Sequence, residues 1–555
     1  MSGFSDAGSP GDPAKSSALP NMAVDLTADV AAVRSAVEVS NADAPVRWRE
    51  ILGIVAFVAV CDVTIYRGHG YAGYALLFAA APPLLWLSSP ERRAGRGMWI
   101  VSLMLIALAG KLLWCGSGPL VGIGFSLLVA FAMTLVGLTP HVVEAISFAL
   151  QTFQSGFWGI GTHCRRVDMQ MRYEPRSGWG ALVAPVLVFL IFGWIFVLAN
   201  PDLLQAIGER FATFAKSIDL WLRQFAPDFW ELWFWVAAWW LAIGLLRPRI
   251  NRAQYEFAAD EDTRPGERGS PLPHLYPMFR NTLVTVAVLF AVYLPFEFGT
   301  LWFREFPEGF HYSGYAHEGA AWLTIALALA TVILSMVFRG NISRDPRIGV
   351  LRKLAWLWSL ENLLLAAAIY HRLFIYVGFN GMTRMRIVGL YGISAVLVGF
   401  FIVIWKIVYQ RNFLWLVRRQ LLTLAIALYL LAMTPLDTIV VGYNVKRIFA
   451  GDPAPAVQIS VHPINSEGIL LLMPLLESDN EIIREGVRAL LAEYYQRAEE
   501  VADMREKQGW TTFQFGDQLA LGELRKGHSA LRIEVDSLIR EERLKQFHDY
   551  VYQWY

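Results

Sequence analysis

Several side chains whose types allow ligand recognition lie at or near the ends of long apolar stretches in this sequence. An arginine binds a phosphate or a carboxylate through paired hydrogen bonds, and a carboxylate beside a histidine can act as a general base. The candidate ligand-binding residues are Glu297, His317, Glu318, His371, Arg372, Arg384, Arg386, Asp437, Asn444 and Arg447. They favour recognition of an anionic headgroup, and none of them is assigned a catalytic role. The simpler alternative is that these groups pair with one another and join short loops.

Sequence patterns for metal binding, nucleotide binding and nucleophilic catalysis do not occur in this chain. His311 and His317 are six residues apart, which is not the spacing of two zinc ligands on one helical face. The three cysteines, Cys61, Cys115 and Cys164, form no CxxC pair and build no disulfide framework. We therefore predict no metal and no cofactor, and these patterns favour a function other than enzymatic catalysis.

The amino-acid composition indicates whether the protein lies in water or in a membrane. Of its 555 residues, 55% are hydrophobic and only 17% are charged, whereas soluble domains carry about 25% charged residues. The mean hydropathy is +0.40, which excludes a disordered chain. A formal net charge of +1 excludes a strongly basic nucleic-acid-binding protein. The lipid bilayer is therefore the expected partner, and no nucleic acid is expected.

Long apolar stretches predict helices that cross the bilayer. A hydrocarbon core of about 30 Å needs roughly 20 apolar residues in a helix. The candidate spans are 48–66, 71–88, 98–115, 120–138, 179–199, 229–246, 280–301, 320–338, 354–375, 387–407 and 420–441. We predict an all-α fold, a polytopic transmembrane bundle of about eleven spans over 48–447. A disordered N-terminal arm over 1–47 precedes it, and a small helical extramembrane domain over 448–555 follows it.

Basic residues predict the orientation of these spans. The loops on one side are rich in Arg and Lys, whereas the loops on the other side carry few. The basic loops are 88–97, 139–178, 247–280, 339–353 and 406–419. Because basic loops stay in the cytoplasm, the N-terminus is expected inside and the tail outside. The net charge of +1 is thus a cancellation between a basic membrane domain and an acidic tail.

The tail has the periodicity of two helical stretches. Ser478-x-x-Glu481 matches a capping box, and apolar residues recur at helical spacing after it. A second helical stretch is expected over 517–555, with a connector at 509–516. The tail is interpreted either as a helical hairpin docked on the membrane domain or as a coiled segment that binds a protein partner.

Short motifs in the second half of the chain resemble those of a known family. The chain is similar to a group of bacterial multi-pass membrane proteins catalogued as a domain of unknown function, over roughly residues 180–530. The motifs are Tyr312–Gly319, Arg372–Tyr376, Asn380–Arg386, Thr434–Asp437, Tyr443–Arg447 and Trp510–Phe513. His317 or Glu318 stands where the family tends to have Arg, and Thr434 replaces its Asn. The resemblance implies a bacterial cytoplasmic membrane protein with a cluster of motifs on its outer face, and it implies no activity.

Three functions are compatible with these features. The leading hypothesis is binding, sensing or handling of an amphiphilic or envelope-derived ligand at the outer interface. Arg372, Arg384 and Arg386 would bind its anionic group, with the tail as a lid or a partner site. A membrane enzyme acting on a lipid-linked substrate is the first alternative, with Glu297, Glu318 or Asp437 as general base. A secondary transporter is the second alternative, indicated by Glu361 inside a span and the proline pair Pro82–Pro83.

Overall fold

Helices are the only regular elements in the described part of the computed structural model of this protein. The described residues are 46–90, 94–156, 227–248, 275–302, 312–337, 346–409, 411, 413–531 and 537–554. The expected N-terminal arm, apart from residues 46 and 47, lies outside them, and so does the expected span 179–199. All of the described residues belong to one compact unit.

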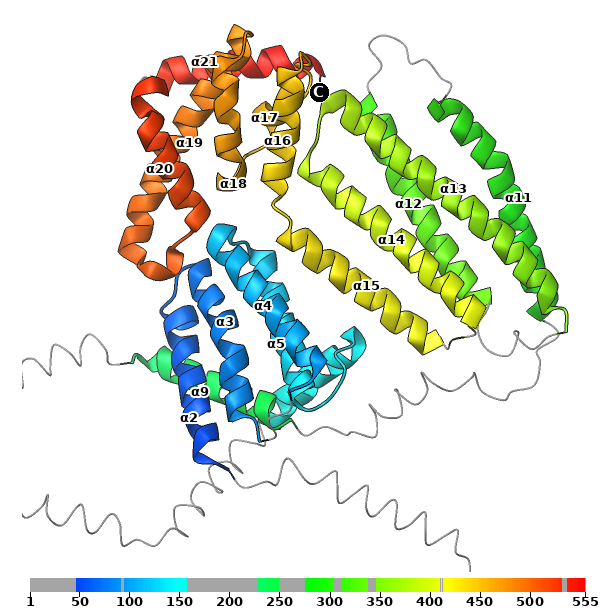
Figure 1. The fold of residues 1–555 in the computed structure, drawn as a ribbon, viewed down its shortest axis with the longest axis horizontal. Coiled ribbons are helices and arrows are strands. Elements are labelled where there is room, and N and C mark those ends of the chain that lie inside the picture. Colours follow the sequence, from blue (N-terminus) through cyan, green and yellow to red (C-terminus); the bar gives the residue numbers. More distant parts are fainter. Residues whose placement is uncertain are drawn as a thin grey trace, which may run out of the picture. The chain divides into compact units, whose positions relative to one another are not determined.

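A first group of helices lies together in one bundle (Figure 1). Its interior holds a cluster of aromatic and aliphatic side chains. Its elements are α2 (Trp48–Cys61), the π-helical turn η1 (Asp62–Tyr66), α3 (Tyr71–Ser88), α4 (Arg96–Cys115), α5 (Gly118–Leu135) and α9 (Phe229–Leu246). Helix α3 packs against α2, α4 and α5, and α9 packs against α2. Phe57, Phe78 and Phe131 are fully buried between these helices. Their burial follows from the apolar periodicity of each span.

A second group of helices surrounds α13. It comprises α11 (Leu275–Trp302), α12 (Tyr312–Val337), α13 (Ile348–Asn380) and α14 (Arg384–Tyr409). Helix α13 packs against each of the other three. Trp358 on α13 is 1% exposed and contacts the ring of Phe290 on α11 edge to face, with ring centroids 5.9 Å apart. Helix α13, the longest of the described helices, also buries the polar residues Ser359, Glu361 and Asn362.

The last expected span, 420–441, differs from the helices in the structure. Helix α15 (Phe413–Met433) ends before Thr434, and a separate helix, α16 (Leu436–Phe449), begins after Pro435. A proline lacks the amide hydrogen and disfavours the helical conformation of the residue before it. Helix α15 contacts both α14 and α5. It thereby connects the two groups of helices.

Helix α16 and the tail share one hydrophobic cluster, so α16 packs with residues that follow it. The tail elements are α17 (Ala456–Val461), α18 (Ser466–Ile469), η3 (Leu470–Glu477), α19 (Glu481–Gln508), η4 (Trp510–Thr512), α20 (Phe515–Leu531), α21 (Ser537–Val551) and η5 (Tyr552–Trp554). Val441 and Val445 of α16 lie in the same cluster as Val487 of α19 and Phe547 of α21.

One detail of the tail differs from expectation. The side chain of Asn480, and not that of Ser478, caps α19, because Asn480 Oδ1 accepts a hydrogen bond of 3.2 Å from the amide of Ile483. Ser478 instead follows the last turn of η3. Within the expected helical stretch 517–555, the described helices are α20 and α21, and residues 532–536 lie outside the described part.

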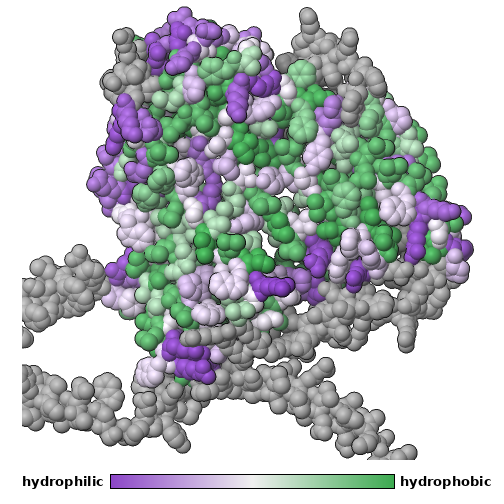
Figure 2. All heavy atoms as spheres, in the orientation of Figure 1, coloured by the Kyte–Doolittle hydropathy of each residue, from purple (hydrophilic) through white to green (hydrophobic). Residues whose placement is uncertain are grey.

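The described helices have the lengths and surfaces of membrane spans. Eight of them are long and apolar enough to cross a bilayer. Two other expected spans correspond to helices whose apolar part is shorter. They are α2, which η1 continues, and the apolar part of α12 over Ala321–Val337. Trp99 and Leu103 on α4 are 66% and 68% exposed, which suits contact with lipid. Figure 2 shows hydrophobic side chains over the span helices and hydrophilic ones gathered over the tail.

Candidate functional site

The turn between α13 and α14 is the centre of the polar cluster. Helix α13 ends where Gly381 adopts a φ of +84°, a conformation that glycine allows at little cost. The side chain of Asn444 on α16 accepts a hydrogen bond of 2.7 Å from the amide of Met382 and donates one of 2.9 Å to its carbonyl. A Cβ at Gly381 would lie 2.5 Å from Asn444 Oδ1. The turn is therefore fitted closely to α16.

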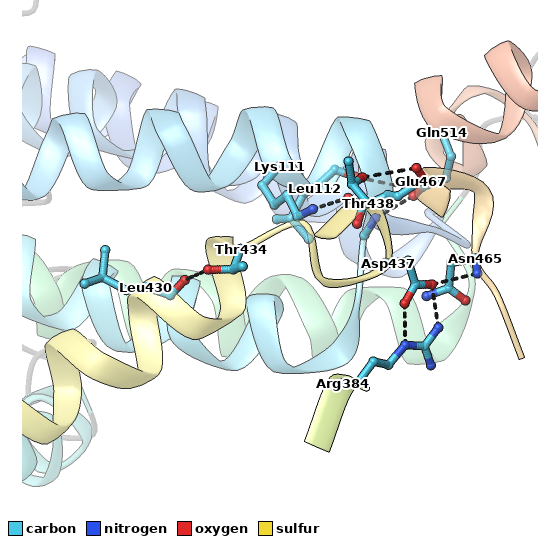
Figure 3. A network of polar contacts seen from close by, with 11 residues as sticks. Lys111, Leu112, Arg384, Leu430, Thr434, Asp437, Thr438, Asn465, Glu467 and Gln514 are labelled. Carbon is cyan, nitrogen blue, oxygen red and sulfur yellow. Dashed lines mark hydrogen bonds and ion pairs between the residues drawn. The ribbon is translucent and has the colours of Figure 1, made fainter. Parts of the chain in front are cut away.

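Asp437 joins the membrane helices to the tail (Figure 3). Its two carboxylate oxygens accept hydrogen bonds from the guanidinium group of Arg384 on α14. Asp437 Oδ2 also accepts a bond of 2.7 Å from the amide of Asn465, and Arg384 Nη2 donates one of 2.9 Å to the carbonyl of Pro463. Asp437 is 4% exposed. One buried carboxylate thus connects α14, α16 and the segment before α18.

Arg386 differs from its neighbours because it has no acidic partner among the described residues. Its residue exposure is 5%, and its Nη1 donates to the carbonyl of Gly381. The guanidinium carbon lies 3.7 Å from the centre of the Tyr376 ring, a cation–π contact. Its Nε is buried without a hydrogen-bond acceptor. A buried guanidinium with an open donor and no counter-charge is the arrangement of an anion-binding group.

Arg447 and Asn380 complete the contacts around the end of α13. Arg447 Nη1 donates a hydrogen bond of 2.9 Å to the carbonyl of Val377 and its Nη2 pairs with Asp452. Asn380 Nδ2 donates one of 2.6 Å to the carbonyl of Trp554 near the end of the chain. The first bond adds a side-chain donor to a carbonyl in the last turn of α13, and the second joins the end of α13 to η5 of the tail.

A second group of expected site residues lies between α11 and α13. Arg372 Nη2 and Glu297 Oε1 form a buried ion pair of 2.5 Å, and the hydroxyl of Tyr293 donates a bond of 2.8 Å to Glu297 Oε2. Helix α12 approaches this pair closely, since a Cβ at Gly319 would lie 2.1 Å from Arg372 Nη1. The half-buried His371 precedes Arg372 on α13. In this group the candidate residues Arg372 and Glu297 pair with each other, which is the simpler of the two interpretations given from the sequence.

Two of the candidate ligand-binding residues have side chains that the structure does not describe. His317 and Glu318 lie on α12, but their side chains are outside the described part. The other eight residues are described, and they lie in the two groups above. Within the described stretches, no cluster of three or more His, Cys, Asp and Glu side chains could hold a metal ion.

The tail also contacts the first group of helices; docking on the membrane domain was one of the two interpretations of the tail, but the residues that make these contacts were not predicted. Lys111 near the end of α4 pairs with Glu467 of α18 (Figure 3). The side chain of Gln514 accepts a bond of 2.6 Å from the amide of Gly116 and donates one of 3.0 Å to the carbonyl of Leu112. The only sequence signal was the Trp510–Phe513 motif beside them.

The arginines set the electrostatics of the junction between the tail and the α13–α14 turn. Loss of hydration, followed by the charges of Arg384 and Arg386, holds the pKa of His462 below its usual range. Asp437 and Asp452 each pair with an arginine, whereas Arg386 keeps its charge unpaired. The junction between the tail and the α13–α14 turn therefore carries an excess of positive charge.

The apolar helices and their buried polar junctions define a multi-pass α-helical membrane protein. The chain belongs to the family described as Domain of unknown function (DUF4153), whose model matches residues 55–461. The match covers the helices up to α17, and it includes every residue of the two polar groups except those contributed by the later tail. No curated protein and no solved structure matches the chain.

Proposed function

We propose that this membrane protein binds the anionic headgroup of an amphiphilic or envelope-derived molecule at the junction between the α13–α14 turn and the tail. The observation that carries the proposal is Arg386, a guanidinium that is 5% exposed and has no acidic partner among the described residues. A charge at this depth is unfavourable unless it is paired. A phosphate or carboxylate bound beside Arg386 would supply the pair.

The neighbouring groups suit such a guest. Arg386 lies in the first turn of α14, where the helix dipole favours a negative charge. Arg384 is one-third exposed, with a side-chain exposure of 35%, and lies beside the tail carbonyl of Pro463. Arg384 would therefore line the entrance to the site, while its pair with Asp437 keeps the tail in place. The tail would serve as the cover of the site.

The orientation belongs to the same proposal. The helix ends opposite the tail carry more basic residues than the ends beside it. The opposite ends hold Arg47, Arg49, Arg96, Arg247, Arg347, Arg352, Lys353, Lys406, Arg411, Arg418 and Arg419. This bias supports a bacterial inner-membrane protein with a cytoplasmic N-terminus and an extracytoplasmic tail domain over 448–555. Labelling of Asp479→Cys in intact cells by an impermeant thiol reagent tests it, and labelling only after lysis contradicts it.

Lipid retention tests the ligand. The wild-type chain purified in mild detergent is examined by native mass spectrometry after incubation with an anionic and a zwitterionic phospholipid. We expect the wild type to retain the anionic lipid preferentially and Arg386→Gln to lose that preference. Arg386→Lys should keep part of it, because lysine keeps the positive charge but lacks the paired hydrogen-bond donors of the guanidinium group.

A matched control separates this effect from a general loss of charge. Arg418 on α15 is buried like Arg386, with an exposure of 3%. Unlike Arg386, it forms an ion pair of 2.5 Å with Glu144, and it lies at the other end of the helices. Arg418→Gln is expected to keep the preference for the anionic lipid. Equal retention in wild type and Arg386→Gln would contradict the proposal, as would equal losses in Arg386→Gln and Arg418→Gln.

A further inference from the structure

Two acceptor oxygens without partners lie deep within α13. Glu361 is 8% exposed and Asn362 is 0% exposed. At 1.5 Å per residue, Glu361 lies about 20 Å from the start of α13 and about 28 Å from its end. Both residues therefore lie in the interior of a span, where ionisable groups are rare and costly. They also lie far along the helix from the junction proposed to bind a headgroup.

The local hydrogen bonds leave these oxygens open. Asn362 Nδ2 donates a hydrogen bond of 2.7 Å to the carbonyl of Trp358, one turn earlier on the same helix. This bond directs the amide group, and its Oδ1 has no donor. Glu361 Oε2 is likewise buried without a partner. An ionised carboxylate in this position would lack the counter-charge that a buried charge needs.

We propose that Glu361 is a proton-binding site through which the group α11–α14 moves protons across the membrane. The carboxylate takes a proton from water on one side, an O–H bond forms, and the neutral acid later returns the proton to water on the other side. No group is oxidised or reduced. A metal ion fits less well, because hard divalent cations take about six or more ligands and two open oxygens are described here.

Titratable groups on the packed helices lie on either side of Glu361 along the span. They are Tyr276, Arg280, Tyr293 and Glu297 on α11, Tyr312, Tyr315, His317 and Glu318 on α12, and Arg384, Arg386, Tyr391, Lys406 and Tyr409 on α14. On α13 itself they are Arg352, Lys353, Tyr370, His371, Arg372 and Tyr376.

Polar groups lie toward both ends of the span from Glu361. Toward the tail, the hydroxyl of Tyr370 lies 2.6 Å from that of Ser394, and the pair of Arg372 and Glu297 follows. Toward the other end, Lys406 is 3% exposed and its Nζ donates a bond of 3.2 Å to the carbonyl of Ser335. Glu361 is therefore an ionisable group between two polar regions of these helices, where a proton site inside a span is expected to lie.

Proton uptake into proteoliposomes tests this inference. The full chain is reconstituted with a pH-sensitive dye in the lumen, and a potassium diffusion potential drives uptake. We expect a dye response for the wild type, loss of the response in Glu361→Gln and a reduced response in Glu361→Asp. Glu523→Gln is the control, because this carboxylate pairs with Lys526 at the surface of α20.

Infrared difference spectra of the wild type give a second test, which does not depend on the folding of a variant. They should contain the carbonyl stretch of a protonated buried carboxylic acid that shifts in heavy water, and Glu361→Asp should move it. Absence of this band contradicts the proposal, as does an equal dye response in wild type and Glu361→Gln. A flux that follows a sodium gradient at constant pH would also overturn it. None of these readouts involves lipid retention, so the two proposals can fail separately.

Discussion

Replacing Asp437 with alanine is expected to release the tail from the membrane helices without unfolding either part. The carboxylate accepts two hydrogen bonds from Arg384 and one from the amide of Asn465. Removing it leaves a guanidinium and a tail amide without their acceptor. The substitution therefore acts where α14, α16 and the tail meet.

The magnitude follows from the burial of the two partners. Breaking a fully buried pair costs about 3–5 kcal/mol, but the side chain of Arg384 is 35% exposed, so water screens part of the loss. We expect about 1–2 kcal/mol for the pair and about 1 kcal/mol for the amide of Asn465. A total of about 2–3 kcal/mol corresponds to about a 30- to 150-fold larger opening constant.

Amide hydrogen exchange of the tail measures this opening. Faster exchange is expected over α17, α18 and η3, while exchange in α3 and α4 stays unchanged. Asp452→Ala is the matched control, because its pair with Arg447 has side chains that are 35% and 26% exposed, and it should cost about 1 kcal/mol or less. The reasoning is refuted if Asp437→Ala opens the tail no more than Asp452→Ala does.

Three further predictions concern the contacts of the tail with the membrane helices. Gly381→Ala should lower the thermal stability of the purified protein more than Gly451→Ala, because both glycines have positive φ but only the first is crowded; equal effects would contradict the close fit of α16. Gln514→Ala should increase proteolysis of the tail, whereas the exposed Gln518→Ala should leave it unchanged; equal cleavage would contradict docking through Gln514. The lowered pKa of His462 means that the unfolded chain takes up a proton more readily than the folded one, so tail protection should fall as the pH drops below about 6.5. His462→Gln should flatten that part of the pH profile, and an unchanged profile would contradict it.

The fold class could be predicted from hydropathy, because a membrane span has to form its backbone hydrogen bonds within the helix and expose apolar side chains to lipid. The last span was placed wrongly for a physical reason. The stretch 420–441 is mostly apolar despite Asp437, so its hydropathy outweighed the proline at 435 that follows α15. The cap of α19 was misplaced because Ser478 and Asn480 are both good capping residues. Only the end of η3 at Glu477 decides between them.

The candidate site was predicted in part. The motifs identified the residues around the α13–α14 turn, but not which of them pair. Arg384 and Asp437 are 53 positions apart, and Lys111 and Glu467 are 356 apart. Such pairs depend on how the tail folds back onto the helices, which no local pattern records. The open Nε of Arg386 is likewise visible only once its neighbours are in place.

A density map of the wild-type protein in nanodiscs that contain anionic phospholipid tests the central claim most directly. The account predicts density of a phosphate or carboxylate group within hydrogen-bond distance of the Arg386 guanidinium, beneath the tail, and its loss in Arg386→Gln. A map in which Arg386 contacts only protein groups, with equal features in both samples, would contradict it.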